Sequence, residues 1–255
     1  MLKKRMILCL LMRNDGVFCN SRNFTLQPVG ELSWIRRYLD FMAIDELVLL
    51  NVDRNHKSVF LFSEQMMELA RLCFVPISAG GGITSLADIE TLLSSGADKV
   101  VINTHALLAP DFITSAADQF GSQCVVVSID CKRIRGAARV MALNGSRDAA
   151  RDVVEWARQV EQRGAGEIFL TSIDRDGTGI GYDIELLRSV VDAVSIPVIA
   201  SGGVGEFQHL MDGIKLGGAS AVSAANIFHY IGDGLVKAKQ YLLSQGGVVP
   251  MWNFW

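Results

Sequence analysis

Two glycine-rich segments have the composition of loops that bind anions. Ala79-Gly-Gly-Gly-Ile83 and Ser201-Gly-Gly-Val204 each follow a short apolar run and precede a segment with helical spacing. Glycine lets the backbone approach a ligand closely and present its N–H groups, and the start of the following helix favours a negative charge. We therefore predict two phosphate-binding loops; the alternative is that the glycines only form tight turns. The glycines expected to contact phosphate are Gly81, Gly82, Gly202 and Gly203.

A carboxylate ends another apolar run and could act as a general acid or base. Asp130 directly follows the run 125–129, and in a βα barrel the carboxyl end of a strand opens onto the mouth where catalysis takes place. The alternatives are a helix cap or a partner for Lys132 or Arg133. Asp176 follows a later run in a similar way, where it could bind substrate hydroxyls or belong to a turn.

Four charged residues stand at the opposite ends of such runs. They are two cations and two anions, namely Arg5, Glu46, Lys99 and Glu167. If the runs are parallel strands of one sheet, all four side chains gather at its amino-terminal end. As simple surface ion pairs they would contribute little to stability, about 0–1 kcal/mol each.

The apolar runs predict a parallel sheet that is buried on both faces, because they are nearly continuous rather than alternating. Segments of helical periodicity separate them, for example Ser85–Ser95, Arg147–Arg163, Asp183–Val194 and Glu206–Leu216. Strand–helix units repeated in this way over 255 residues favour a closed (βα)8 TIM barrel over an open sheet. The predicted strands are Met6–Leu11, Leu47–Val52, Pro76–Ala79, Val100–Ile102, Val125–Ile129, Glu167–Thr171, Pro197–Ala200 and Ala221–Ala224.

The barrel is predicted to consist of two similar halves. The segment Asp45–Asp53 resembles Gly166–Asp174, and equivalent residues such as Glu46 and Glu167 are 121 positions apart. The two glycine loops have the same separation. A repeat of this length indicates that four strand–helix units are duplicated. We predict one domain over 1–255, with half-barrels at about 1–121 and 122–245 and a C-terminal tail at 246–255.

The composition argues against several classes of protein. The net charge of −3 gives no general attraction to nucleic acid or to an anionic membrane, and no apolar stretch is long enough to span a bilayer. The 5 cysteines form no CxxC pair, so we predict reduced thiols in a cytoplasmic protein. The 4 histidines lack metal-ligand spacing, and we expect neither a metal nor another cofactor. The apolar start of the chain is expected to be the first strand rather than a signal peptide.

Together these residues resemble the cyclase subunit of imidazole glycerol phosphate synthase, a histidine-pathway family with a barrel of the ribulose-phosphate-binding type. The resemblance covers nearly the whole chain, and the order of its motifs makes it specific. The related isomerase of the same pathway shares the repeated half-barrel but fits these motifs less well. The matching segments are Lys4-Arg5, Cys9-Leu10, Asp45-Glu-Leu47, Gly80-Gly-Gly-Ile83, Gly96-Ala-Asp-Lys99, Ile129-Asp130, Ile173-Asp-Arg-Asp-Gly-Thr178, Gly181-Tyr-Asp183, Ile199-Ala-Ser-Gly-Gly-Val204 and Ile227-Phe-His229.

The resemblance implies a heterodimer with a separate glutaminase, which docks on the amino-terminal end of the barrel and releases ammonia into its interior. Asp98 matches a docking residue that helps to activate the glutaminase, and the four charged residues match the gate of the ammonia channel. The substrate would be a phosphorylated small molecule at the other end, beside Asp130 as the catalytic carboxylate. In addition to the loop glycines, the implied phosphate- and substrate-binding residues are Asn103, Thr104, Thr171, Asp176, Gly177, Ala225 and Asn226.

The mouth of the barrel departs from the family pattern. The family has an aspartate at the end of the first strand, which forms an acid–base pair with the counterpart of Asp130; here this position is Leu11. A leucine can neither transfer a proton nor carry a charge. A substrate-binding lysine of the family appears as Cys19, an aspartate that ends the second strand appears as Asn51, and Asn226 stands where serine is usual. The ammonia-supply residues are thus retained, whereas the cyclisation residues are altered.

We interpret the chain as an ammonia-channelling synthase subunit for a product outside the histidine pathway. It resembles the cyclase-like proteins of surface-polysaccharide (O-antigen) gene clusters, where a third amidotransferase protein takes part in converting a sugar acetamido group to an acetamidino group. One alternative is a working cyclase that makes imidazole glycerol phosphate and AICAR with Asp130 alone. The other is a non-catalytic scaffold that binds and activates a glutaminase.

Overall fold

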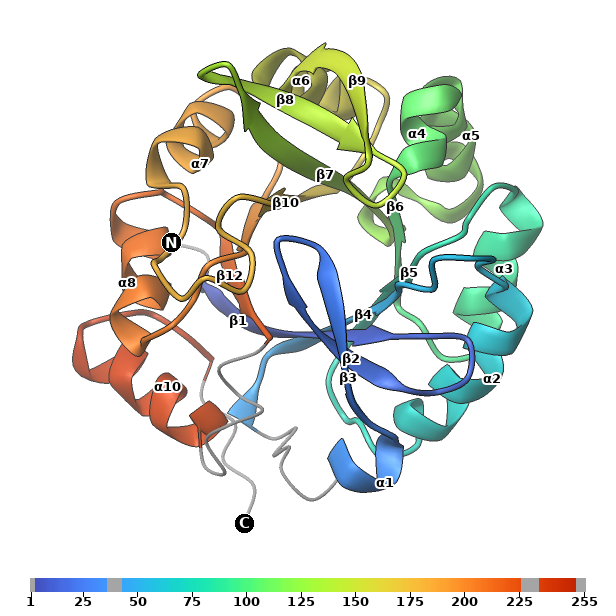
Figure 1. Cartoon of the computed structure of the whole chain (residues 1–255), viewed down its shortest axis with the longest axis horizontal. Coiled ribbons are helices and arrows are strands. Elements are labelled where there is room, and N and C mark those ends of the chain that lie inside the picture. The colour runs from blue at the N-terminus through green and yellow to red at the C-terminus, as the bar shows by residue number, and fades with distance from the viewer. Residues whose placement is uncertain (1–2, 36–42, 226–233, 251–255) are drawn as a thin grey trace.

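The computed structural model describes residues 3–35, 43–225 and 234–250 and has a closed barrel of parallel strands at its centre. The ring closes because β12 pairs with β1 and β7 pairs with β10 (Figure 1). This arrangement confirms the predicted (βα)8 barrel. In order around the ring, the strands are β1 (Arg5–Met12), β4 (Glu46–Asn51), β5 (Ile77–Gly80), β6 (Lys99–Ile102), β7 (Val125–Ile134), β10 (Glu167–Ser172), β11 (Val198–Ser201) and β12 (Ala221–Ala224).

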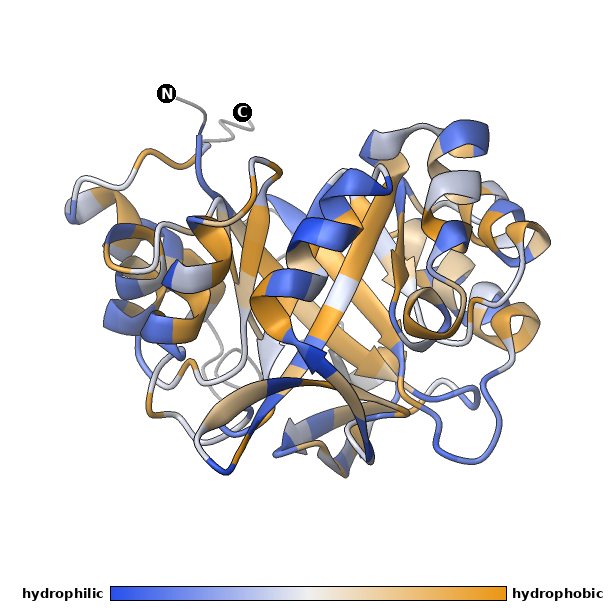
Figure 2. Cartoon of the chain, turned by 90° about the horizontal axis from the view of Figure 1, so that it is seen from above, coloured by the Kyte–Doolittle hydropathy of each residue, from blue (hydrophilic) through white to orange (hydrophobic). Residues whose placement is uncertain are grey.

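The helices surround the barrel and turn their apolar sides toward the strands (Figure 2). On α6 the buried side chains include Val153, Trp156 and Val160, which follow helical spacing, and each such residue contributes about 1.5–3 kcal/mol by burial. No helix in the described ranges has the length and apolar character needed to cross a membrane. The helices are α1 (Leu32–Ile35), α2 (Val59–Ala70), α3 (Leu86–Ser94), α4 (Thr104–Leu108), α5 (Asp111–Phe120), the 3-10 helix η2 (Ser122–Cys124), α6 (Val153–Gln162), α7 (Ile184–Val191), α8 (Phe207–Lys215) and α10 (Gly234–Ser244).

The predicted helix over 147–163 is wrong in its first part. Its first residues form the strand β9 (Arg147–Asp152), and α6 begins only after them. The Asp152 carboxylate accepts hydrogen bonds from the backbone N–H groups of Val154 and Glu155, which caps the helix at this point. The residues before the cap are extended because they pair with a neighbouring strand, and helical spacing in the sequence does not reveal such a pairing.

Two hairpins rise from the carboxyl-terminal end of the barrel. The first consists of β2 (Phe18–Arg22) and β3 (Thr25–Gly30), and it lies across the centre of the ring in Figure 1. The second consists of β8 (Ala137–Ala142) and β9, and β8 pairs with the outer half of β7. This pairing explains why β7 continues to Ile134 rather than ending at the predicted Ile129. The hairpins cover the mouth and bring their turns over it.

Side chains inside the barrel form layers, because alternate residues of each strand point inward. The middle layer is a small apolar cluster that is separate from the larger core between strands and helices. Charged residues lie in the barrel at the amino-terminal side of this layer, and hydroxyl and carboxyl groups lie at its carboxyl-terminal side. The apolar side chains of the middle layer include Ile7, Val48, Val101, Val126, Phe169 and Ile199.

Candidate active site

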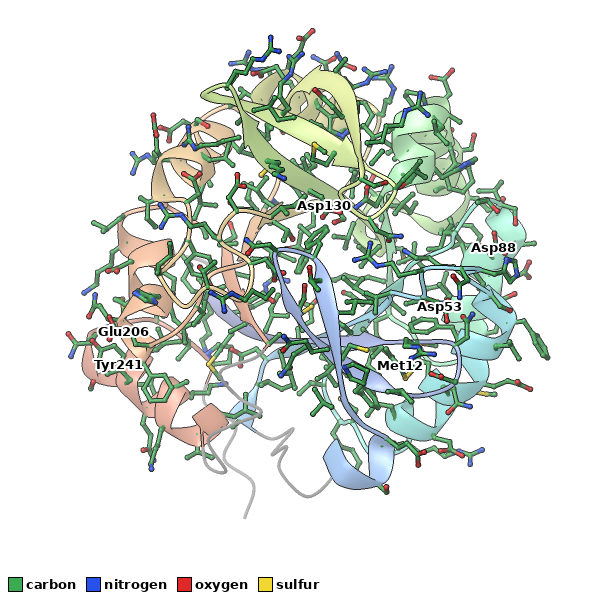
Figure 3. The ribbon with its side chains drawn as sticks, viewed as in Figure 1. Met12, Asp53, Asp88, Asp130, Glu206 and Tyr241 are labelled. Atoms are coloured by element: carbon green, nitrogen blue, oxygen red, sulfur yellow. The ribbon has the colours of Figure 1, made fainter. Side chains whose placement is uncertain are left out.

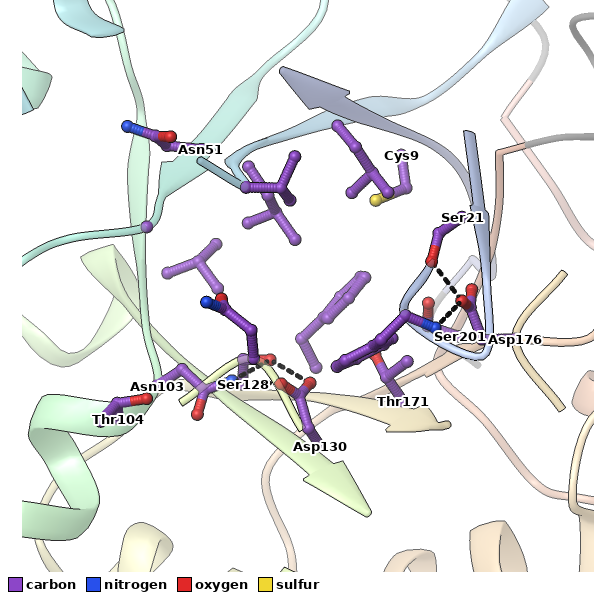
Figure 4. Close-up of a pocket in the computed structure, with 18 of the residues that line it drawn as sticks. Cys9, Ser21, Asn51, Asn103, Thr104, Ser128, Asp130, Thr171, Asp176 and Ser201 are labelled. Carbon is purple, nitrogen blue, oxygen red and sulfur yellow. Dashed lines mark hydrogen bonds between the residues drawn. The ribbon is translucent and has the colours of Figure 1, made fainter. Parts of the chain in front are cut away.

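A cavity of about 470 Å³ opens at the carboxyl-terminal end of the barrel. The ends of the barrel strands and the loops that follow β4, β5, β6, β10 and β11 line it, and residues of both hairpins contribute to its upper part. Figure 4 shows part of this lining, including Asp130, Asn103 and Thr171. A cavity of this volume can enclose a small-molecule substrate, and in βα barrels this end carries the active site.

Asp130 lies in the wall of the cavity, inside the ring of strands (Figure 3). Its carboxylate accepts hydrogen bonds from Asn103 Nδ2, at 2.7 Å, and from Ser128 Oγ, at 3.3 Å. Burial raises the pKa of Asp130 to about 6, although both hydrogen bonds and the charge of Lys57 act against this rise. A carboxyl group with this pKa exchanges its proton near neutral pH, which suits a general acid or base.

The wall opposite Asp130 is apolar. Leu11 lies on β1, which is four strands away from β7 in either direction around the ring. Its side chain lines the cavity and, like that of Leu50, packs against the apolar cluster inside the barrel. The nearby Cys19 is buried outside the cavity lining, and its thiol lies 3.9 Å from the Val17 carbonyl oxygen. No carboxylate or amine from these two positions therefore faces Asp130.

Asn51, at the end of β4, points away from the centre of the cavity (Figure 4). Its side-chain nitrogen donates to Asn14 Oδ1 at 2.9 Å, and its side-chain oxygen accepts a hydrogen bond from the Asp53 backbone N–H at 3.0 Å. The side chain therefore supports the turn between β1 and β2 and the loop after β4. It does not present a polar group to a substrate in the middle of the cavity.

Both glycine loops line the cavity, one after β5 and the other after β11. Gly82 and Gly203 have φ angles of +90° and +114°. A Cβ atom on Gly82 would lie 2.8 Å from Lys57 Cβ, and one on Gly203 would lie 2.2 Å from the Gly181 carbonyl oxygen, so the fold itself requires glycine at both positions. Their backbone N–H groups donate to no other residue within the described ranges, and both can donate to an anion in the cavity.

Thr171 lies in the barrel wall of the cavity, whereas Asp176 contacts the β2–β3 hairpin that covers it. Thr171 lies beside Asp130, because the two residues are paired between β10 and β7. Asp176 holds the β2–β3 hairpin in place: its Oδ2 accepts hydrogen bonds from the Ser21 hydroxyl and from the Phe24 N–H. Burial raises the pKa of Asp176. Gly177 allows its loop to approach the backbone of β2 closely, since a Cβ on this residue would lie 2.0 Å from the Ser21 carbonyl oxygen. Asp176 and Gly177 thus form part of the cavity wall and also anchor its cover.

Asn103 and Thr104 follow β6 at the start of α4. Asn103 donates to Asp130, while its Oδ1 atom is buried and has no hydrogen-bond partner within the described ranges. The Thr104 hydroxyl accepts a 3.1 Å hydrogen bond from the Leu143 N–H, so it holds the β8–β9 turn over the cavity. Ala225 lines the cavity, and Asn226 lies outside the described residues.

The four charged residues at the other end of the barrel form a ring of ion pairs. Arg5 Nη1 lies 2.6 Å from Glu46 Oε2, and Nη2 of the same guanidinium pairs with Glu167. Lys99 Nζ lies 3.0 Å from Glu46 and 3.1 Å from Glu167, and the Ser78 hydroxyl donates to Glu46 at 2.7 Å. The two carboxylate side chains are only 3% and 6% exposed. These pairs are therefore partly buried, and the interpretation as weak pairs on the rim does not describe them.

Asp98 is exposed directly before Lys99, at the same end of the barrel. Its Oδ2 accepts a 2.8 Å hydrogen bond from the Ile77 N–H, and its own N–H donates to the Ile77 carbonyl oxygen at 2.8 Å. The side chain thus has a structural contact with β5 in addition to its exposure. The effect of a substitution at Asp98 therefore has two components, loss of the exposed charge and loss of the hydrogen bond from the Ile77 N–H.

Three polar side chains near the cavity do not stand out in the sequence. Lys57 and Arg54, from the loop after β4, both reach Asn144 in the β8–β9 turn. Lys57 Nζ donates to Asn144 Oδ1 at 2.8 Å, whereas Arg54 donates to the backbone carbonyls of Asn144 and Phe24. For Lys57 and Arg54, the signal that could have identified them is a pair of cations in a loop at the carboxyl end of a predicted strand, where barrel enzymes place functional residues.

Comparison with known protein families agrees with this architecture. A family model described as "Histidine biosynthesis protein" matches residues 12–232. The matched range contains both glycine loops and Asp130. It begins directly after Leu11, so the match does not depend on the altered position of the first strand.

Proposed function

Because this chain belongs to the histidine biosynthesis protein family and is a barrel of that type, we propose that it is the synthase subunit of an ammonia-transferring complex. A glutaminase forms a heterodimer with it and supplies ammonia at the amino-terminal end of the barrel. The ammonia passes through the interior and reacts with a phosphorylated substrate in the cavity at the other end.

The position of the ion-pair ring relative to the cavity is the main support for this proposal. The ring residues stand on β1, β4, β6 and β10, and the other ends of these strands line the cavity. Apolar side chains occupy the interior between the two. An ammonium ion would lose its hydration in this layer at a large free-energy cost, whereas the cost for neutral ammonia is much smaller. Opening of the ring requires partly buried ion pairs to break, and this cost in free energy favours the closed state.

The chemistry at the cavity end also fits a ligand that donates hydrogen bonds. Asn103 Oδ1 and Ser223 Oγ are buried acceptors without a partner among the described residues, and both residues line the cavity. Ammonia has three N–H groups that such acceptors can bind. Asp130, with its pKa raised to about 6 by burial, can accept the proton that nitrogen releases when it bonds to the substrate carbon.

Leu11 supports a second part of the proposal, that the acceptor reaction differs from ring closure in the histidine pathway. The resemblance to the cyclase family implies two carboxylates on opposite strands, and this cavity has Asp130 on one side and an apolar wall on the other. We propose a product outside the histidine pathway. The specific candidate is an acetamidino group on a sugar of a surface polysaccharide, made with a third amidotransferase protein.

A working histidine-pathway cyclase is the second candidate, and the family match favours it. In that case Asp130 would carry out both proton transfers alone. General acid–base groups typically contribute about 10²–10⁴-fold to a rate, so loss of one member of a pair should be visible in turnover.

The test is turnover of the histidine-pathway ribonucleotide by the purified chain, first with ammonium salts and then with a glutaminase and glutamine. We expect the chain to stimulate glutamine hydrolysis, while cyclisation stays at least about 10²-fold below that of a cyclase with both carboxylates. Turnover at the rate of such a cyclase would show that the chain is a working histidine-pathway enzyme. Absence of any stimulation of a glutaminase from the same organism would rule out the ammonia-transferring complex.

Asp130→Asn then separates an enzyme from a scaffold. If Asp130 acts in the reaction, this variant loses product formation by the complex but still stimulates glutamine hydrolysis. Asp118→Asn, an exposed change on α5, is the matched control for the loss of one negative charge. Unchanged product formation in Asp130→Asn would mean that the chain only binds and activates its partner.

A further inference from the structure

Lys57 occupies a position beside the first glycine loop that suits a group binding an anion. It belongs to the loop between β4 and α2 and lines the cavity. Its Cβ lies 2.8 Å from the place that a Cβ on Gly82 would occupy, so its stem packs directly against the glycine backbone. An anion that accepts a hydrogen bond from the Gly82 N–H is therefore within the range of a flexible lysine side chain.

The hydrogen bonds of the cavity cations distinguish Lys57 from Arg54. Among the described residues that line the cavity, these two are the lysine and arginine side chains. The Arg54 guanidinium binds the backbone carbonyls of Phe24 and Asn144, so it connects the two hairpins. The Lys57 ammonium has three N–H donors and makes one hydrogen bond within the described ranges, to Asn144 Oδ1. Its other donors can bind a ligand.

The charge of Lys57 is not balanced by a direct ion pair with any described residue. Burial lowers the pKa of Lys57, and the charges of Asp130 and Asp53 oppose this effect. A largely buried cation that bonds only to a neutral amide is destabilising for the free protein. Entry of an anion into the cavity would remove this penalty, which is a reason to connect Lys57 with a ligand rather than with the fold.

Among the described residues, no lysine or arginine in the cavity accompanies the second glycine loop. A Cβ on Gly203 would lie 3.1 Å from Arg175 Cβ, but Arg175 does not line the cavity and its guanidinium lies toward the Ile180 carbonyl oxygen, at 3.4 Å. The two loops therefore differ although they occupy equivalent places in the repeat. Within the described ranges, the first loop has an ammonium group in the cavity, and the second presents backbone N–H groups without one.

We propose that Lys57 is the specificity-determining cation of the first glycine loop. Its ammonium leaves Asn144 Oδ1 and binds an oxygen of a phosphate group that also accepts a hydrogen bond from the Gly82 N–H. The ligand class is a phosphate monoester or free phosphate, which share this chemistry. The assignment rests on the proposed function only in placing a phosphorylated substrate in this cavity.

The test is an NMR titration of the full chain with inorganic phosphate, in which the backbone amide signals of Gly82 and Gly203 report on the two loops separately. We expect Lys57→Met to raise the Kd at Gly82 about tenfold or more, because a charge-assisted hydrogen bond is lost. The Kd at Gly203 should stay within about twofold. Lys57→Arg keeps the charge and should stay within about threefold at Gly82.

Two further variants control for loss of charge and for folding. Lys132→Met removes an exposed lysine near Asp130 and should leave the Kd at Gly82 and the Kd at Gly203 unchanged. Lys57→Gln keeps a polar side chain and tests the charge if Lys57→Met fails to fold, which circular dichroism would show. A second titration with ribose 5-phosphate separates the two sources of phosphate, because tighter binding than inorganic phosphate at Gly82 identifies the monoester.

The outcomes distinguish this assignment from the proposed function. An equal Kd at Gly82 in the wild type, Lys57→Met and Lys57→Gln would overturn the role of Lys57 and leave the proposed function intact. Equal weakening at both loops would also overturn it, because the effect would not be local. If phosphate shifts neither loop of the wild type, both the role of Lys57 and the phosphorylated substrate of the proposed function are wrong.

Discussion

The side-chain nitrogen of Asn103 donates a 2.7 Å hydrogen bond to Asp130 Oδ2, and this bond leaves Asn103 Oδ1 buried without a partner among the described residues. Asn103 directly follows β6, and Asp130 lies on the adjacent strand β7. They act as one unit, because the donor orients the carboxylate and opposes the rise in its pKa. The unit presents a titratable oxygen and an unused acceptor to the same cavity.

The stability of the protein should depend on pH through Asp130. Burial raises its pKa in the folded state from an ordinary value of 3.8 to about 6, so the folded chain holds a proton that the unfolded chain has already released between these values. Stability therefore falls as pH rises from about 4 to about 6 and stays lower above that. A shift of about two units corresponds to about 3 kcal/mol. Asp130→Asn should remove this loss, so its unfolding free energy should exceed that of the wild type at pH 7.

Urea unfolding at a series of pH values measures this effect. The difference between Asp130→Asn and the wild type should be small at pH 4, grow up to about pH 6 and then remain constant. Asp118→Asn, on the exposed side of α5, should show no such growth. A constant difference over the whole range would mean that Asp130 has an ordinary pKa in the folded protein.

Glu46→Gln should destabilise the barrel strongly. Glu46 forms ion pairs with Arg5 and Lys99 and accepts a hydrogen bond from the Ser78 hydroxyl, and its side chain is 3% exposed. Neutralising it leaves two partly buried cations with one carboxylate, and breaking a buried ion pair costs about 3–5 kcal/mol. Urea unfolding at neutral pH measures the change.

The exposed pair of Arg188, on α7, and Asp192, at the C-cap of this helix, provides a matched comparison for the ring. These side chains are 56% and 60% exposed and one helical turn apart. Asp192→Asn should therefore cost only about 0.5 kcal/mol or less. If Glu46→Gln costs no more than Asp192→Asn, the ring behaves as surface ion pairs and cannot hold the channel closed.

Leu11→Asp should lower stability, because it places a carboxylate among apolar side chains inside the barrel. Leu11 packs against the same apolar cluster as Leu50 and lines the cavity. Burying a polar group without a partner costs about 1–3 kcal/mol by mutational measurements. Leu11→Met has a similar volume and should cost less than about 1.5 kcal/mol. Equal stability of both variants in thermal unfolding would show that the site already accommodates a charge.

The charge of Asp98 should matter for the partner and its hydrogen bond for the fold. Asp98→Asn keeps an acceptor for the Ile77 N–H, whereas Asp98→Ala loses it and should cost about 1 kcal/mol more. Both variants should reduce stimulation of glutamine hydrolysis if the partner recognises the carboxylate. Asp15→Asn, in the turn at the opposite end of the barrel, is the control. Full stimulation by Asp98→Asn would remove this residue from the docking surface.

The sequence by itself determined the barrel and the ends at which its polar residues gather. Continuous apolar runs identify strands buried on both faces, and the two-residue period of a strand is a local property. For this reason the order of residues along the chain is enough to assign the first residues of β4, β6 and β10 to one end of the barrel and Asp130 to the other. The 121-residue repeat and the glycine loops are equally visible, because they depend on residue type and spacing alone.

Only the tertiary structure decided what closes the cavity and which side chains remain free to act there. Asp176 accepts a hydrogen bond from the Ser21 hydroxyl, and the Asn51 side chain donates one to Asn14. Residues with helical spacing form the strand β9. These outcomes follow from pairing between segments far apart in the chain, and residue spacing contains no information about such partners. The same pairing brings Lys57 to Asn144 beside the first glycine loop, and Lys57 lines the cavity there.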